Sequence, residues 1–197
     1  MRTALPLAAL VCLAGGAHAA QESALRFVDL RVQGGVVANE GMMASATIMA
    51  GDIGNKDQHV ISLDADMGIV LGLRGQAGQV TADFEDGGPQ NLDVTLGGGT
   101  ILGGFGFYLG KHSHAELLFG YGRGIGSGTA SSLGDDDNID YYQYQGELGW
   151  YYTWSTHLQV GLTVGYTVLK IEYERYDGDV DAKIDGFDAG IALGYRF

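Results

Sequence analysis

Charged side chains recur inside stretches of this sequence in which nearly every second residue is apolar. Arg31 lies in one such stretch, Asp66 in a second and Glu147 in a third. An arginine buried without a carboxylate would be very costly. The three residues are therefore expected to form an ion-pair network, with Arg31 reaching either Asp66 or Glu147. The functional alternative for buried acids of this kind is a cation path or a proton relay.

The histidines are the next candidates for chemistry. His59, His112, His114 and His157 all lie at or beside short turns and far from the Ser- and Asp-rich segments. A hydrolytic site needs a histidine beside the serine or acid with which it works, so no catalytic centre is expected. Residues 112–114 place two histidines at i and i+2, which is a poor metal site without a third ligand. A solvated turn is the preferred interpretation, with no metal and no cofactor.

Two acidic segments could bind cations. The first is Asp-Asp-Asp at 135–137, and the second, 177–181, has Asp at alternate positions like the start of a calcium loop. The second segment has Ala182 where that loop needs Gly, and Asp188 where it needs a closing Glu. Both segments are therefore interpreted as solvated acidic loops.

Composition excludes several classes of protein. The chain has 11 basic and 24 acidic residues and a net charge of −13, whereas nucleic-acid binding needs clustered Lys and Arg. Its 34 glycines and 2 prolines among 197 residues suit a continuous sheet without helices. No apolar run reaches the ~18 residues of a transmembrane helix.

Residues 1–20 resemble a secretory signal peptide. Arg2 supplies the positive start, an apolar run follows at 4–14, and Ala-His-Ala at 17–19 fits a cleavage site. Removal of this segment would also remove Cys12, so no disulfide framework is expected. We predict a signal peptide at 1–20 and one barrel domain at 21–197.

Apolar residues alternate with small or polar residues along most of the chain after residue 24, which is the period of a β-strand. Glycines 97–99 separate two halves of opposite parity and predict a β-bulge. The polar residues 126–138 and 176–181 predict loops. The expected strands are 25–37, 42–53, 61–74 (an extension through 80–84 is left open), 92–109, 115–121, 142–152, 158–168 and 186–197.

Eight strands joined alternately by short turns and longer loops predict an all-β, eight-stranded antiparallel up-and-down transmembrane β-barrel. Alternation alone does not say which face is inside, because a lipocalin barrel has its apolar face inside. Here the polar faces are rich in small residues, which suit a narrow packed lumen, and aromatic residues form two girdles. The girdles are Trp150, Tyr152, Tyr195 and Phe197 on the turn side, and Tyr121, Tyr142, Tyr144 and Tyr166 on the loop side.

The lumen is then the face that carries the charges. Arg31, Asp66 and Glu147 lie at similar depth when residues are counted from the turn side. Structural filling is favoured over a channel, because side chains fill a barrel of this size. The expected lumen charges are Asp29, Asp64, Asp66, Glu116, Glu147 and Asp188 against Arg31 and Arg196.

The last strand carries a family resemblance. It ends in Gly-Tyr-Arg-Phe at 194–197, which is similar to the ending of small bacterial outer-membrane barrels of the OmpX/Ail or opacity type. The resemblance covers the final strand and the architecture, and no loop motif matches. It implies that Tyr195 and Phe197 form the signal read by the barrel assembly machinery. It also implies a place in the outer membrane of a Gram-negative cell envelope.

The expected function is a non-enzymatic outer-membrane protein with a structural or adhesive role, acting through acidic extracellular loops. Its expected partners are outer-membrane lipid, lipopolysaccharide and the assembly machinery, with no nucleic acid and with a surface partner that the sequence does not name. Two alternatives stay open. One is a narrow cation-preferring channel, and the other is a barrel enzyme acting on outer-membrane lipid.

Overall fold

The computed structural model describes residues 25–38, 41–53, 67–82, 92–110, 112–130, 134–175 and 178–197. The predicted signal peptide and Asp66 lie outside this part of the chain. None of the described residues belongs to a helix that could cross a membrane. The strands are β1 Leu25–Val37, β2 Gly41–Ile53, β3 Met67–Ala82, β4 Leu92–Gly110, β5 Ser113–Ala130, β6 Gly134–Thr153, β7 Leu158–Arg175 and β8 Gly178–Arg196.

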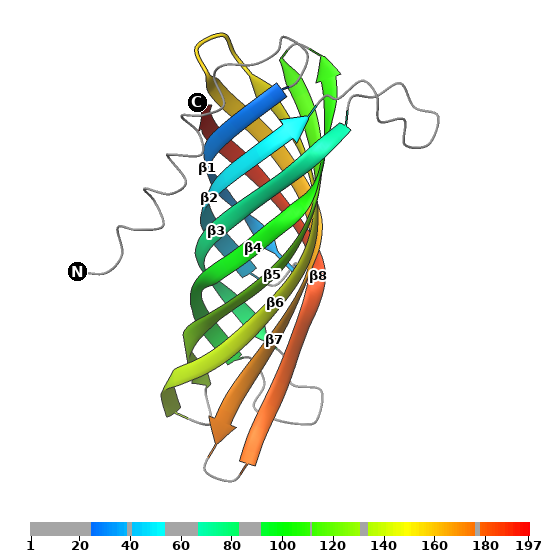
Figure 1. Ribbon diagram of the computed structural model, residues 1–197. Coiled ribbons are helices and arrows are strands. Elements are labelled where there is room, and N and C mark those ends of the chain that lie inside the picture. Colours follow the sequence, from blue (N-terminus) through cyan, green and yellow to red (C-terminus); the bar gives the residue numbers. More distant parts are fainter. Residues whose placement is uncertain are drawn as a thin grey trace, which may run out of the picture.

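The eight strands form one closed barrel in sequence order, and every neighbouring pair is antiparallel. The barrel closes between β1 and β8, which are paired from Asp29 and Arg196 to Val36 and Ala189. This confirms the predicted fold class and the architecture expected from the OmpX/Ail resemblance. The strands wind obliquely around the barrel, and the ends of β5, β6, β7 and β8 extend beyond β1 and β2 at its lower end in Figure 1.

We call the end that holds the β4–β5 and β6–β7 connections the short-turn end, and the opposite end the hairpin end. The connection from Thr153 to Leu158 is a tight turn in which the Trp154 amide donates to the Leu158 carbonyl at 2.9 Å. His157 adopts a positive φ of 69° within this turn. The chain also finishes at the short-turn end, where the Phe197 amide donates to the Val28 carbonyl at 3.0 Å.

The outer face of the barrel is apolar and exposed. Leu162 is 55% exposed, Ile191 60% and Ile101 67%, and all eight strands contribute large apolar side chains of this kind. Polar side chains are buried instead, as Glu116 and Asp29 are at 0% exposure. A soluble barrel has the opposite arrangement, so this is the surface of a membrane-spanning barrel, with its lipid-facing side outward.

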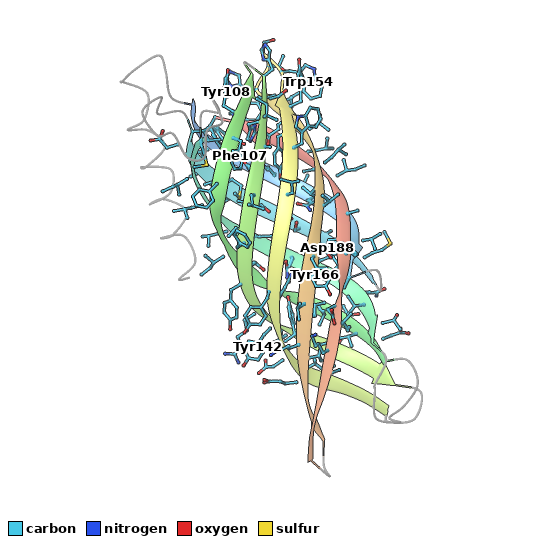
Figure 2. All side chains as sticks on the ribbon, turned by 90° about the vertical axis from the view of Figure 1, so that its right-hand side faces the viewer. Phe107, Tyr108, Tyr142, Trp154, Tyr166 and Asp188 are labelled. Carbon is cyan, nitrogen blue, oxygen red and sulfur yellow. The ribbon has the colours of Figure 1, made fainter. Side chains whose placement is uncertain are left out.

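Aromatic side chains border this apolar belt at both ends. Towards the short-turn end the rings of Tyr195 and Phe197 are 5.1 Å apart, and towards the hairpin end those of Tyr121 and Tyr144 are 5.3 Å apart. Figure 2 shows Trp154 at the short-turn end and Tyr142 and Tyr166 far along the barrel from it. This is the placement that membrane interfaces favour.

The predicted bulge at Gly97–Gly99 is wrong. Strand β4 stays in register with both β3 and β5 through these glycines. The shifts in the pairing of β4 with β5 and of β5 with β6 occur between Tyr108 and Gly110 and between Gly126 and Gly128. Val94 and Leu96 point into the barrel, each at 1% exposure. The even-numbered residues of β4 whose side chains the structure describes therefore face inward along the whole strand. The apolar residues change position in the sequence because the interior itself becomes apolar near Val94 and Leu96.

The predicted loops at 126–138 and 176–181 are largely strand. β5 continues to Ala130 and β6 begins at Gly134, while β7 ends at Arg175 and β8 begins at Gly178. The acidic residues 135–137 thus belong to β6, where Asp135 and Asp136 pair with Thr129 and Gly128 of β5. Towards the hairpin end the backbone ladder continues, but the apolar side chains now lie inside the barrel, as Ile139, Ile171 and Ile184 do.

Candidate functional site in the barrel interior

Four charged side chains form a cluster at the short-turn end of the lumen. We call Asp29, Arg31, Glu116 and Arg196 the four-charge cluster. Arg31 donates to both oxygens of Glu116, with 2.7 Å from Nη1 to Oε2 and from Nη2 to Oε1, and its Nη2 also donates to Asp29 Oδ2 at 2.7 Å. Arg196 binds both oxygens of the same Asp29 at 2.8 Å. Two cations thus neutralise two anions through direct hydrogen bonds.

Rings enclose this cluster. The guanidinium of Arg31 lies 3.9 Å from the centroid of Tyr151, and that of Arg196 lies 4.3 Å from Phe27. His114 stacks on Tyr151 at 5.2 Å, and its Nε2 lies 2.9 Å from Glu116 Oε1. His114 is only 1% exposed, so the interpretation of this residue as part of a solvated turn is wrong. It faces inward because it shares the parity of Glu116 on β5.

A second ion pair lies farther along the lumen. Arg74 and Glu147 are joined by two parallel hydrogen bonds of 2.9 Å. Arg74 also donates to Thr47 Oγ1 at 3.1 Å and to Gln33 Oε1 at 3.3 Å. We call Arg74 and Glu147 the two-charge cluster, and both residues are buried.

The structure divides the predicted network between these two clusters. Arg31 binds Asp29 and Glu116, whereas Glu147 binds Arg74. Asp66 lies outside the described residues. Counting residues from the turn missed this division because it ignores the tilt of the strands, which places residues of equal count at different heights. Arg74 carried a usable signal, since it has the lumen parity of its apolar stretch.

The described lumen charges nearly balance. Arg31, Arg74 and Arg196 are each paired with one or more of Asp29, Glu116 and Glu147. Asp188 is a further acid, and its Oδ1 accepts a 2.8 Å hydrogen bond from the amide of Ala38. Figure 2 shows Asp188 about half-way along the barrel. Such balance leaves little negative charge to attract a passing cation.

A chain of amides continues from the two-charge cluster towards the hairpin end. Gln76 donates to Gln143, and Gln143 donates to Gln145 Oε1 at 2.7 Å. Nε2 of Gln145 has no partner among the described residues. It borders a polar cavity of ≈40 Å³, also lined by Arg74, Glu147 and Asp188. A cavity of this size and polarity can hold water.

Apolar side chains occupy both ends of the lumen. At the short-turn end, an apolar cluster on β1–β5 lies beside the four-charge cluster. At the hairpin end, a larger cluster fills the barrel interior, and we call it the outer plug. The short-turn cluster is Phe27, Met49, Ile53, Val70, Leu102 and Leu118. The outer plug is Ala38, Val80, Val94, Leu96, Ile139, Tyr141, Leu169, Ile171, Ala182 and Ile184.

The interior therefore resembles a protein core more than a reaction centre. The described histidines lie at the short-turn end, where His112 Nδ1 lies 3.2 Å from the Thr153 carbonyl and His114 contacts Glu116. Within the described residues, no three His, Asp or Glu side chains are grouped as metal ligands. The chemistry that this arrangement supports is charge neutralisation and packing.

Comparison with known proteins finds likeness among solved structures. No protein-family model and no curated protein matches the sequence. Among solved structures, the chain is similar to Ail, the attachment invasion locus protein of Yersinia pestis, at 12% identity with a TM-score of 0.43. The match covers 90% of this chain and 100% of that chain. Because the identity and the TM-score are this low, the fold is assigned from the strand pairing of this chain itself.

Proposed function

We propose that the protein is a non-enzymatic β-barrel of a bacterial outer membrane, with a structural or surface-contact role. The observation that carries this proposal is an exposed apolar belt around an interior filled by ion pairs and apolar side chains. Such a barrel is anchored in lipid, and its interior offers little room for a substrate. What it can present to its surroundings is its rims.

The hairpin end is the rim proposed to face the outside of the cell. Outer-membrane barrels keep short turns in the periplasm and longer connections outside. The extended β5–β6 and β7–β8 hairpins carry Asp135–Asp137, Asp179 and Asp181 in their sequence. This acidic rim favours contact with basic surfaces or with cations. Export through the predicted signal peptide and insertion by the assembly machinery belong to the same proposal.

Cysteine labelling on intact cells tests this orientation. The only cysteine of the chain is Cys12, in the predicted signal peptide, so introduced cysteines report alone. A membrane-impermeant maleimide should label Asp135→Cys on intact cells. Ser155→Cys, in the β6–β7 turn, should react only after the outer membrane is permeabilised. Labelling of Ser155→Cys alone on intact cells would overturn the proposed orientation.

The paired charges in the lumen argue against the alternative of a narrow cation channel. An acid neutralised by a bidentate arginine is poorly placed to coordinate a moving ion. Planar-bilayer recordings of the refolded protein should give no conductance steps, while a heat-dependent gel shift of the same sample reports the folded barrel. Steady cation-selective steps from heat-modifiable protein would favour the channel instead.

The positions of the histidines argue against the alternative of an enzyme that acts on lipid. His112, His114 and His157 lie at the short-turn end, opposite to the rim proposed to meet the outer leaflet. Incubation of the refolded barrel with lipopolysaccharide and phospholipid should leave both uncleaved. Release of fatty acid by wild type but not by a denatured sample would contradict the non-enzymatic proposal.

A further inference from the structure

A row of cationic side chains crosses the outside of the barrel near the hairpin end. Arg123 on β5 pairs with Tyr142 on β6, Tyr142 with Lys170 on β7, and Lys170 with Lys183 on β8. Their side chains point outward, with Arg123 60% and Lys183 58% exposed. We call the three cations, together with Tyr142 between them, the cationic row. Direct cross-strand pairing keeps them adjacent on one face.

The position of the basic residues is uneven. Three of the basic side chains that the structure describes, Arg31, Arg74 and Arg196, point into the lumen and are paired there. Among the basic residues whose side-chain exposure the structure describes, the outward-facing ones are Arg123, Lys170 and Lys183, and all three belong to the cationic row. In a chain with a net charge of −13, this concentration of cations needs a reason.

The row lies just beyond the aromatic girdle of the hairpin end. Arg123 and Tyr142 are two residues farther out along their strands than the ring pair Tyr121 and Tyr144. Two residues of strand span about 7 Å. Interfacial tyrosines mark the headgroup level of a membrane, so the cations lie at the level of lipid phosphates.

The ion pairs that these cations form with nearby acids are weak enough for another anion to replace them. Arg123 Nη2 lies 3.2 Å from Asp140 Oδ2, and Lys183 Nζ lies 3.2 Å from Asp185 Oδ1. Both pairs are solvent-exposed, and exposed pairs contribute about 0–1 kcal/mol. Lys170 forms no ion pair with any described residue. The guanidinium of Arg123 also lies 5.3 Å from the ring of Tyr142.

We infer that the cationic row binds the phosphate groups of lipid headgroups in the leaflet at the hairpin end. Arg offers a bidentate fork to phosphate, and Lys a point charge. Three cations spaced across neighbouring strands match a lipid that carries more than one phosphate, such as the phosphorylated glycolipid of an outer leaflet. This inference rests on the proposed function, because it needs the barrel to lie in a membrane with this end outward.

Unfolding in defined bilayers tests the inference. The protein is refolded into phosphatidylcholine vesicles with no addition, with bisphosphorylated lipid A or with dephosphorylated lipid A, and the urea midpoint is measured. Bisphosphorylated lipid A should raise the midpoint, and dephosphorylated lipid A should not. The triple variant Arg123→Gln, Lys170→Gln, Lys183→Gln should lose this rise while keeping its midpoint in phosphatidylcholine alone.

Matched variants separate phosphate binding from general charge effects. Glu172→Gln changes an exposed charge on β7 two residues from Lys170 and should keep the rise. The charge-conserving Arg123→Lys, Lys170→Arg, Lys183→Arg variant should keep most of it. Any of three results would overturn the inference. The urea midpoint could rise equally with dephosphorylated lipid A, it could rise equally with inorganic phosphate in place of lipid A, or the triple variant could keep the full rise. Failure of wild type to fold into any vesicle would instead overturn the proposed function.

Discussion

Arg31 makes four side-chain hydrogen bonds in the lumen, and three of them go to carboxylate oxygens. It donates to both oxygens of Glu116 and to Asp29, and its Nε donates to Gln159 at 2.9 Å. Loss of one partner from a buried ion pair is far more costly than loss of both, because the remaining charge is left without compensation. The contribution of this site is therefore measured best by paired substitutions.

Arg31→Ala should destabilise the barrel by about 3–5 kcal/mol, because it leaves Glu116 buried without its cation. Adding Glu116→Gln should recover part of this loss by removing the unpaired charge. Urea unfolding in lipid vesicles measures both variants, with Glu116→Gln alone as the control. Equal midpoints for the single and double variants would show that this carboxylate does not depend on Arg31.

The two lumen clusters should behave as separate sites. Arg31 and Glu147 share no hydrogen-bond partner among the described residues. The losses of unfolding free energy from Arg31→Gln and Glu147→Gln should therefore add to within about 0.5 kcal/mol in the double variant. A larger deviation from additivity would restore the single network that the sequence suggested. Arg74→Gln with Glu147→Gln, a contacting pair, should deviate and serves as the positive control.

At the scale of a strand, β7 shows how one period divides lipid from lumen. Leu162 is 55% exposed on the outer face, whereas its neighbour Thr163 is 4% exposed and accepts a 2.8 Å hydrogen bond from Gln33 Nε2. Adjacent residues of β7 thus need opposite polarity, because one faces the outside of the barrel and the next fills its interior.

Leu162→Arg should lower the free energy of unfolding in bilayers by roughly 2–4 kcal/mol, since it places a charge against lipid near the middle of the strand. Thr163→Arg should fail for a different reason, which is crowding of the filled lumen. A spin label at position 162 should be quenched by a lipid-soluble agent, and one at position 163 should not. The reverse quenching pattern would mean that the barrel is inside out.

Strand β8 closes the barrel and carries the residues expected to guide assembly. The ring of Phe197 is 64% exposed and contacts only its strand neighbour Tyr195 at 5.1 Å among the described ring pairs. Little packing is therefore lost when this ring is removed. The strand pairing from Asp29–Arg196 onward does not need it.

Phe197→Ala should lower the amount of barrel in the outer membrane much more than the stability of refolded protein. The reason is that the exposed ring is available to the assembly machinery while contributing little to the fold. Quantitative blotting of outer-membrane fractions, beside urea unfolding of the purified variant, measures the two effects. Equal membrane levels of variant and wild type would contradict this role. Ile191→Ala, on the same face of β8, controls for loss of an exposed apolar side chain.

At the scale of the whole molecule, the barrel has an apolar outside and a polar inside only in its middle section. Its lipid-facing belt is apolar, and the lumen inside the belt is polar and ion-paired. Towards the hairpin end the relation reverses. There the outer plug makes the interior apolar, and outward positions carry charges such as Lys170 and Lys183. The section beyond the membrane is therefore packed like a soluble barrel, which gives the long hairpins rigid support.

Periodicity by itself determined the architecture of this protein. Alternation over 158–168 and 186–197 predicted β7 and the inner part of β8, and the aromatic positions predicted which face meets lipid. These features are readable because a strand in a membrane has one apolar face and one polar face, a local property that repeats every two residues. The same reasoning placed Arg31 and Glu147 on the polar faces of their strands, and both side chains are buried inside the barrel.

Only the tertiary structure decided which lumen residues meet and where the strands end. The charged partners of Arg31 come from β1 and β5, and that of Glu147 comes from β3. Strand tilt and stagger set height in a barrel and leave no trace in one strand's sequence. The outer plug was missed for a related reason. Val94 and Leu96 break the expected parity, and only closure of the barrel shows that an apolar side chain pointing inward is buried by strands distant in sequence.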